Sequence, residues 1–134
     1  MIIALDFDGT IVQHKYPEIG SEIPFATATI RKLIEEKHRI ILWTVRRGKL
    51  LQDAVDWCNE RGIEFYAVNK SYPEEEIGEG YGKVNADLFI DDRNLGGLPN
   101  WGDIYKMISE NKSWKDIYSE TEEPQKKKKK KWLW

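Results

Sequence analysis

Short apolar runs alternate with amphipathic stretches along the first hundred residues, and this alternation restricts the fold more than any other feature. The runs, at residues 2–6, 39–44, 64–68 and 87–91, are nearly continuous in apolar side chains and too short for helices, so they predict buried strands. Between them, the stretch after Pro24 and residues 48–61 carry apolar residues at helical spacing. Strands that alternate with helices imply a parallel sheet with right-handed crossovers. We therefore expect an α/β fold, a three-layer Rossmann-like sheet with helices on both faces.

The remaining residues are expected to form loops, short helices and a tail. The predicted loops are 9–22 and 69–84, and the predicted short helices are 101–109 and 113–119. A chain of 134 residues has the length of one domain. We expect that domain to span 1–120 and a basic tail to span 121–134.

Composition indicates a cytoplasmic protein. The chain is 40% hydrophobic and 33% charged, and it contains no apolar run long enough to span a bilayer and no visible signal peptide. Cys58 is the single cysteine, so no internal disulfide can form. The net charge is −2 and the six lysines from Lys126 to Lys131 contribute +6, so the rest of the chain sums to −8. An acidic body therefore carries a strongly basic tail.

The stretch IIALDFDGTIV places two carboxylates at the end of the first predicted strand. Because successive side chains of a strand alternate between faces, Asp6 and Asp8 lean to one side and Phe7 leans to the other. Gly9 then allows a sharp turn. Two adjacent carboxylates repel each other, and at neutral pH they favour a shared proton or a bound cation. The stretch therefore predicts a functional site.

Polar residues also end two other predicted strands. Thr44 ends the second strand, and Asp91 and Asp92 end the fourth. In open parallel sheets, ligands bind beyond the carboxyl ends of the strands. We therefore expect these residues to converge with Asp6 and Asp8 on one edge of the sheet.

The motifs DFDGT, LWT, a lysine and FIDD, in this order, resemble those of the haloacid dehalogenase superfamily of phosphotransferases over roughly the first 100 residues. The resemblance implies that Asp6 is a nucleophile that forms an aspartyl phosphate. It also implies that Asp8 is first the general acid for the leaving group and then the base that activates water. Thr44 would donate a hydrogen bond to the phosphoryl oxygens. Thr10 is predicted among the substrate-binding residues, and its hydroxyl would hold the shape of the loop through a hydrogen bond.

The same resemblance implies a catalytic lysine, which would neutralise charge on the nucleophile and the phosphate. Lys83 lies just upstream of the last predicted strand and is favoured for this role. Lys70, which follows the third strand, is the alternative.

A Mg²⁺ ion is also implied. Magnesium prefers few carboxylates together with waters and substrate oxygens. Asp6 and Asp92 by their side chains, and Asp8 by its backbone carbonyl, fit that preference. Asp91 lies beside them. Asp92 is favoured over Asp91 as the direct ligand, but the choice between the two stays open.

Cations near the same edge suggest how an anionic substrate is held. Arg46, Arg47 and Arg93 are either exposed loop charges or a clamp for phosphate, which arginine can bind in bidentate fashion. Loops 9–22 and 69–84 are too short to fold as a cap domain, so the chain resembles the capless branch of the superfamily. An open site suits a large substrate, or it is covered by another copy of the chain.

Other residues are expected to have packing roles. Cys58 falls on the apolar stripe of its helix, and we expect it in the core. Packing is also the expected role of Trp43, Trp57, Trp101 and Trp114. His14 lies in the loop after the acid pair, where either a plain loop position or a role near the substrate is open.

The sequence therefore predicts a Mg²⁺-dependent phosphohydrolase that acts on a small or polymeric phosphoester. Two alternatives stay open. DFDGT and IDDR also resemble the phosphatase half of polynucleotide kinase-phosphatases, which indicates a nucleic-acid end-processing enzyme. The other alternative is a non-catalytic phosphate- or metal-binding module with the same fold. Three roles are open for the lysine tail. It is an arm that binds nucleic acid or an anionic surface, a solvated tail, or a segment folded back on the acidic body.

Overall fold

The computed structural model describes residues 1–76, 82–112 and 116. The chain divides into two compact units, Met1–Leu98 and Pro99–Trp134, which are described separately. This division falls earlier than the predicted domain boundary at residue 120, which lies outside the described residues. The lysine tail also lies outside them.

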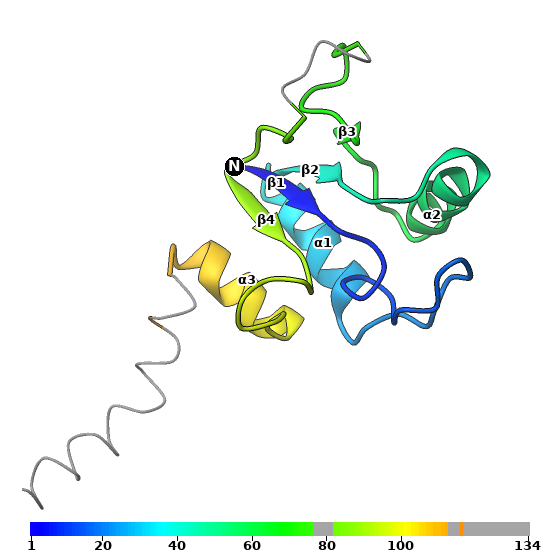
Figure 1. Cartoon of the computed structure of the whole chain (residues 1–134). Coiled ribbons are helices and arrows are strands. Elements are labelled where there is room, and N and C mark those ends of the chain that lie inside the picture. The colour runs from blue at the N-terminus through cyan, green and yellow to red at the C-terminus, as the bar shows by residue number, and fades with distance from the viewer. Residues whose placement is uncertain (77–81, 113–115, 117–134) are drawn as a thin grey trace, which may run out of the picture. The chain divides into compact units, whose positions relative to one another are not determined.

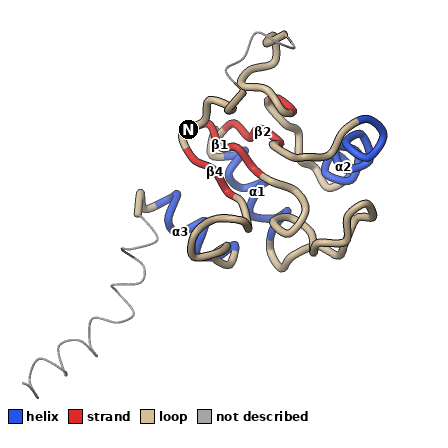
Figure 2. The backbone as a smooth tube through the Cα atoms, viewed as in Figure 1, coloured by secondary structure: helices blue, strands red, loops and turns tan. Residues whose placement is uncertain are grey.

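The first unit contains a four-stranded sheet in which all neighbouring strands run parallel. Its strands are β1 (Ile2–Leu5), β2 (Arg39–Leu42), β3 (Ala67–Val68) and β4 (Leu88–Ile90). Their order is β3-β2-β1-β4, so β1 lies between β2 and β4 (Figures 1 and 2). The predicted α/β parallel sheet is therefore confirmed. β3 is shorter than the predicted 64–68, and it forms ladder pairs with β2 at Ala67 and Val68.

Two helices connect the first three strands, α1 (Ala26–Glu35) and α2 (Gly48–Glu60). At the start of α1 the carboxylate of Glu22 accepts a hydrogen bond from the Thr27 hydroxyl at 2.9 Å, in place of a side-chain cap. Because β1, β2 and β3 follow one another across the sheet, right-handed crossovers put both helices on the same face. The Arg31 guanidinium of α1 donates to the carbonyl of Arg61, just after α2, at 2.8 Å, so the two helices lie side by side.

The opposite face of the sheet is covered by the connection between β3 and β4. Ala4, Ile41 and Ala67 form a buried cluster there together with Val84 from that connection. Trp43 packs against the cluster and meets Phe89 edge to face, with ring centroids 5.2 Å apart. These residues alternate along the strands with the buried side chains that face the helices, which are Ile3, Leu5, Ile40 and Leu42. Within this unit the described helices therefore cover one face.

The second unit contains α3 (Trp101–Ser109), as predicted. Asn100 caps this helix, because its side chain accepts a hydrogen bond from the Asp103 backbone N–H at 2.8 Å. Trp101, Ile104 and Ile108 are buried at helical spacing. The predicted helix over 113–119 and Trp114 lie outside the described residues, apart from Asp116.

The two remaining predictions of packing can be checked within the first unit. Cys58 is fully buried, and Trp57 packs edge-on against Phe7 with ring centroids 5.8 Å apart. Of the helices in the described part of the chain, none has both the length and the apolar character that a membrane span requires.

Candidate functional site

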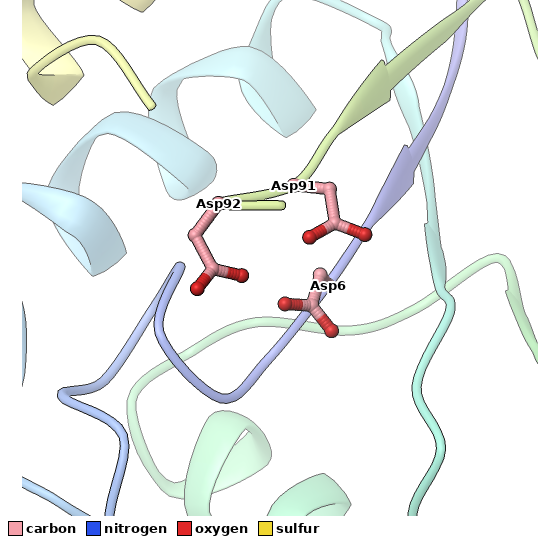
Figure 3. Close-up of side chains that lie close together, drawn as sticks. All are labelled: Asp6, Asp91 and Asp92. Carbon is pink, nitrogen blue, oxygen red and sulfur yellow. The ribbon is translucent and has the colours of Figure 1, made fainter. Parts of the chain in front are cut away.

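Three aspartates gather at the carboxyl ends of two adjacent strands. Asp6 follows β1, and Asp91 and Asp92 follow β4. Since β1 and β4 pair in parallel with Leu5 opposite Ile90, both strands end at the same level. Figure 3 shows the three side chains turned toward a shared space, and one carboxylate oxygen from each lies within 4.8 Å of those from the other two. The structure thus brings together three of the residues that the sequence predicted at this edge.

The loop after β1 is shaped by contacts with the end of β4. The Thr10 hydroxyl donates to the Asp6 carboxylate at 3.0 Å and accepts from the Asp92 backbone N–H at 3.1 Å. Gly9 has a left-handed φ of 83°, and a Cβ at this position would collide with the Asp92 carboxylate. Thr10 is fully buried, so it holds the loop as expected but does not lie where a substrate could touch it.

The environment of Asp6 disfavours its negative charge. Burial is the main cause, and the nearby charge of Asp91 adds to it, so the pKa of the Asp6 carboxyl rises from 3.8 to about 7. The hydrogen bond from Thr10 acts in the opposite direction and is outweighed. A cation beside these carboxylates would stabilise the ionised form of Asp6.

Asp8 is joined to Arg46 in a buried bidentate ion pair. Arg46 Nε lies 2.7 Å from one Asp8 oxygen, and its Nη2 lies 2.8 Å from the other. Asp8 is 7% exposed and Arg46 is 0% exposed, so water screens this pair very little. The hydrogen bonds that Arg46 donates to the Asp8 carboxylate raise the pKa of the Arg46 guanidinium. The carboxylate that the resemblance assigns to proton transfer is therefore engaged within the protein.

The other N–H groups of Arg46 connect the loop after β1 with the start of α2. They donate to the backbone carbonyls of Pro17, Glu18 and Leu50 at distances of 3.2, 2.8 and 3.3 Å. The guanidinium also lies over the Tyr16 ring, 5.2 Å from its centroid. This geometry differs from our expectation of a substrate clamp, because a buried guanidinium with its donors in use cannot bind a phosphate without rearrangement. The ion pair between Asp8 and Arg46 could not be predicted from local sequence, because the two residues lie 38 positions apart.

A small cavity of about 190 Å³ lies beside the acids. Its wall includes Asp6, Asp8 and Asp91, and also His14, Tyr16, Val45 and Arg93. Arg93 and His14 therefore lie near the acids, as the clamp and loop predictions required. Tyr16 and Val45 were not predicted, although both are exposed at this position, at 47% and 78%. They give the mouth of the cavity an apolar rim.

Thr44 lines a second, larger cavity of about 680 Å³ rather than the small one. Its backbone N–H donates to the Asn69 side chain at 2.8 Å, and its hydroxyl accepts from the Arg46 N–H at 3.2 Å. Asn69 was not predicted. Its left-handed φ of 54° suits asparagine better than most residues, and a polar residue just after a strand was the available signal. Arg47 lines the same cavity and is exposed.

The two candidate lysines lie in different surroundings. Lys70 lines the larger cavity together with Thr44, and its ammonium donates to the Pro73 carbonyl at 2.6 Å. Lys83 is exposed, and its ammonium lies over the Phe89 ring, 4.8 Å from the centroid. Of these two described lysines, only Lys70 contributes to the wall of either cavity. Neither lysine lines the small cavity that contains Asp6, so the catalytic lysine stays a prediction, with Lys83 favoured by the sequence and Lys70 as the alternative.

The chain is similar to a protein of known structure. The solved structure of a conserved protein from Bacteroides thetaiotaomicron matches it with a TM-score of 0.85 and 63% sequence identity. The match covers 89% of this chain and 98% of that chain. No model of a known protein family matches the chain, and no curated protein matches it.

Proposed function

We propose that the chain, which belongs to the same family as this conserved protein of Bacteroides thetaiotaomicron, is a Mg²⁺-dependent phosphohydrolase. The cluster of Asp6, Asp91 and Asp92 carries the proposal, because three carboxylates, each with one oxygen within 4.8 Å of the others, concentrate negative charge at the ends of β1 and β4. The Thr10 hydroxyl fixes Asp6 within this cluster. The motifs around these residues resemble those of haloacid dehalogenase phosphotransferases. A three-layer arrangement, as in that superfamily, is part of this proposal.

The residues in the cluster fit a hard divalent cation. All three side chains offer oxygen, the ligand atom that Mg²⁺ prefers. In the part of the chain that the structure describes, no lysine or arginine forms an ion pair with Asp6, Asp91 or Asp92. The side chains of Asp6 and of Asp91 or Asp92 would hold the ion, together with the backbone carbonyl of Asp8. When bound, Mg²⁺ would screen an incoming phosphate from the carboxylates and favour the ionised form of Asp6.

Asp6 would supply the attacking oxygen. This oxygen forms a bond to phosphorus while the bond from phosphorus to the leaving oxygen breaks, and the electron pair of that bond remains on the leaving oxygen. Water then attacks phosphorus, the bond to Asp6 breaks, and inorganic phosphate departs with the carboxylate restored. Proton donation by Asp8 to the leaving oxygen requires its ion pair with Arg46 to open. Leaving groups that depart as stable anions avoid this requirement.

Hydrolysis of p-nitrophenyl phosphate tests the proposal. We expect turnover that depends on Mg²⁺ and that Asp6→Asn abolishes, since an amide cannot replace the nucleophilic oxygen. Asp56→Asn is the matched control, because Asp56 is an exposed aspartate of α2 that accepts a hydrogen bond only from Gln52 among the described residues. Wild-type turnover in Asp6→Asn would show that Asp6 is not the nucleophile.

Calorimetric titration with Mg²⁺ tests the metal ligands separately from turnover. The sequence favours Asp92, so Asp92→Ala is expected to weaken binding more than Asp91→Ala. Asp91 lines the small cavity with Asp6, whereas the Asp92 carboxylate packs against Gly9. A larger effect of Asp91→Ala would identify Asp91 as the direct ligand.

A non-catalytic metal-binding module is the second candidate, and the Asp8–Arg46 ion pair favours it. An enzyme that transfers protons through Asp8 gains nothing from two buried hydrogen bonds to that carboxylate. Mg²⁺ binding without turnover of any aryl or alkyl phosphate would support the module. Turnover of aryl phosphate that is lost in Asp6→Asn would exclude it.

Location and partners extend the proposal. We place the protein in the cytoplasm, where the lone Cys58 suits a reducing environment. Its partners would be a phosphorylated substrate, another copy of the chain that covers the open site, and a nucleic acid or an anionic surface that binds the lysine tail.

A further inference from the structure

The buried ion pair with Arg46 removes Asp8 from the role of proton donor. Phosphoryl transfer from an ordinary phosphomonoester to Asp6 leaves an alkoxide or a phenoxide, which requires a proton. Both Asp8 oxygens instead accept hydrogen bonds from Arg46, at 2.7 and 2.8 Å. All five N–H groups of this guanidinium are in use, because the other three donate to backbone carbonyls. Release of Asp8 would leave the buried guanidinium without its carboxylate partner, which is costly.

The wall of the small cavity offers other groups for proton transfer. A cavity of about 190 Å³ is small, so the side chains on its wall lie close to a phosphoryl group bound at Asp6. Besides Asp6 and Asp8, the described residues of this wall are His14, Tyr16, Val45, Asp91 and Arg93. Valine has no ionisable group, Asp91 belongs to the acid cluster, and an arginine keeps its proton. The remaining candidates on this wall are His14 and Tyr16.

The two steps of the reaction distinguish between these candidates. One group must give a proton to the leaving oxygen and must then remove a proton from the attacking water. An imidazole can do both near neutral pH, because its charged and neutral forms are both populated there. A phenol keeps its proton at that pH, so it cannot serve as the base. His14 is also exposed, so the leaving group and water can both reach it.

The loop that carries His14 is held by hydrogen bonds on both sides of this residue. On one side, the Gln13 N–H donates to the Ser21 carbonyl at 2.8 Å. On the other side, the Glu18 carbonyl accepts a hydrogen bond from Arg46 at 2.8 Å. Arg46 therefore has two effects. It engages the carboxylate that would otherwise transfer the proton, and it fixes the loop whose histidine lines the cavity.

We propose that His14, in place of Asp8, is the general acid and base of the reaction. This assignment rests on the phosphohydrolase function proposed above. In the first step a bond forms from an Asp6 oxygen to phosphorus and the bond to the leaving oxygen breaks. The leaving oxygen keeps that electron pair and takes the proton of the His14 imidazolium.

The second step returns both groups to their starting forms. Neutral His14 removes a proton from water while the water oxygen forms a bond to phosphorus. The bond from phosphorus to Asp6 breaks, and its electron pair returns to the carboxylate. Inorganic phosphate departs, and the imidazolium is restored for the next substrate.

Two substrates of similar shape that differ in their need for a proton test the inference. Phenyl phosphate releases a basic phenoxide, whereas p-nitrophenyl phosphate releases a stable anion. The value of kcat/KM reports the steps up to departure of the leaving group, so the later use of His14 as a base does not affect it. His14→Gln should reduce kcat/KM for phenyl phosphate by about 100-fold, a typical contribution of a general acid, and that for p-nitrophenyl phosphate by less than about threefold. Equal changes for the two substrates, or no change for either, would overturn the inference.

Two control variants accompany this measurement. Tyr16→Phe removes the other candidate proton donor but keeps the ring that lies over Arg46. His38→Gln changes the second histidine of the chain, which lies outside the walls of both cavities. Neither change should alter the ratio of the two kcat/KM values. A selective loss for phenyl phosphate in Tyr16→Phe, with none in His14→Gln, would assign the proton to the phenol and refute the role of His14.

The pH dependence of kcat/KM gives a second measurement. The ionisable side chains that line the cavity with His14 are Asp6, Asp8, Tyr16, Asp91 and Arg93. Because a general acid must be protonated, kcat/KM for phenyl phosphate should fall as pH rises and His14 loses its proton. This alkaline decrease should be absent in His14→Gln. Its persistence in that variant would show that another of these groups donates the proton.

Comparison with Asp6→Asn separates this inference from the proposed function. If Asp6→Asn abolishes hydrolysis of p-nitrophenyl phosphate but His14→Gln does not discriminate between the two substrates, the phosphohydrolase stands and the role of His14 is refuted. If the wild-type protein hydrolyses neither substrate, the proposed function itself fails, and the role of His14 fails with it.

Discussion

Substitution of Asp6 by asparagine is expected to change how the stability of the metal-free protein depends on pH. The pKa of Asp6 is about 7 in the folded protein and 3.8 in the reference state. Between these values the folded chain holds a proton that the unfolded chain has released. The free energy of unfolding therefore decreases as pH rises from about 4 to about 7, and this contribution is constant above that range. The Asn variant lacks the titrating group, so its free energy of unfolding does not decrease for this reason.

The size of the effect follows from the same pKa. A displacement from 3.8 to about 7 corresponds to about 4 kcal/mol of lost stability at pH 8. Because Asp6 is only partly buried, solvent weakens the effect, and we expect about 2 kcal/mol. Added Mg²⁺ should restore stability to the wild type at pH 8, because it pairs with the charged carboxylate.

Urea denaturation at pH 5 and pH 8, without and with Mg²⁺, measures these quantities. The difference in unfolding free energy between Asp6→Asn and wild type should grow by about 1 kcal/mol from pH 5 to pH 8 in metal-free buffer, because the remainder of the loss is complete below pH 5. Asp56→Asn, at an exposed site of α2, should show no such growth. Parallel pH profiles for Asp6→Asn and wild type would refute the view that Asp6 is held in an environment that disfavours its charge.

Three further predictions concern the ion pair, the lysines and the tail. Asp8→Ala should lower the unfolding free energy by about 3–5 kcal/mol, because it leaves the buried Arg46 guanidinium without its carboxylate partner. In urea melts, the double variant Asp8→Ala with Arg46→Met should lose less unfolding free energy than the sum of the two single changes. Additive losses would contradict this. Lys83→Ala should reduce kcat/KM for aryl phosphate by about tenfold or more and exceed the effect of Lys70→Ala, and the opposite order would identify Lys70 as the catalytic lysine. Deletion of 126–134 should leave aryl phosphate turnover unchanged and weaken binding to DNA or anionic vesicles at low salt, whereas equal binding by both forms would show that the tail is no polyanion arm.

The sequence predicted the sheet and the positions of the acids because both depend on local patterns. Each apolar run is bounded by polar residues, so the strand ends that carry Asp6 and Asp91 could be found from neighbours a few positions away. The extent of β3 was overestimated because the strand ends where its ladder with β2 ends. A pattern of apolar residues contains no information on that partner.

The surroundings of the site residues could not be predicted in the same way. Arg46 and Asp8 lie 38 positions apart, and nothing in either local stretch indicates that one neutralises the other. An arginine after a strand is equally compatible with an exposed clamp and with a buried pair. The position of Lys83 over Phe89 likewise depends on where the β3–β4 connection crosses the sheet, which the sequence of that connection does not reveal.

The central position of β1 has a consequence for how the protein folds. β1 and β2 are separated by one helix, but β1 and β4 become neighbours only after a long segment of chain has closed on itself, and the contact from Thr10 to Asp92 spans 82 positions. Closing a loop of that length costs conformational entropy before the contacts between β1 and β4 can form. This pairing is therefore expected to form late. During synthesis on the ribosome, one side of β1 waits as an unpaired edge until β4 has emerged, and unpaired edges are sites of aggregation. The acid cluster therefore forms only once β4 has paired with β1. A chain interrupted before Leu88 would carry its proposed nucleophile without the carboxylates that complete the metal site.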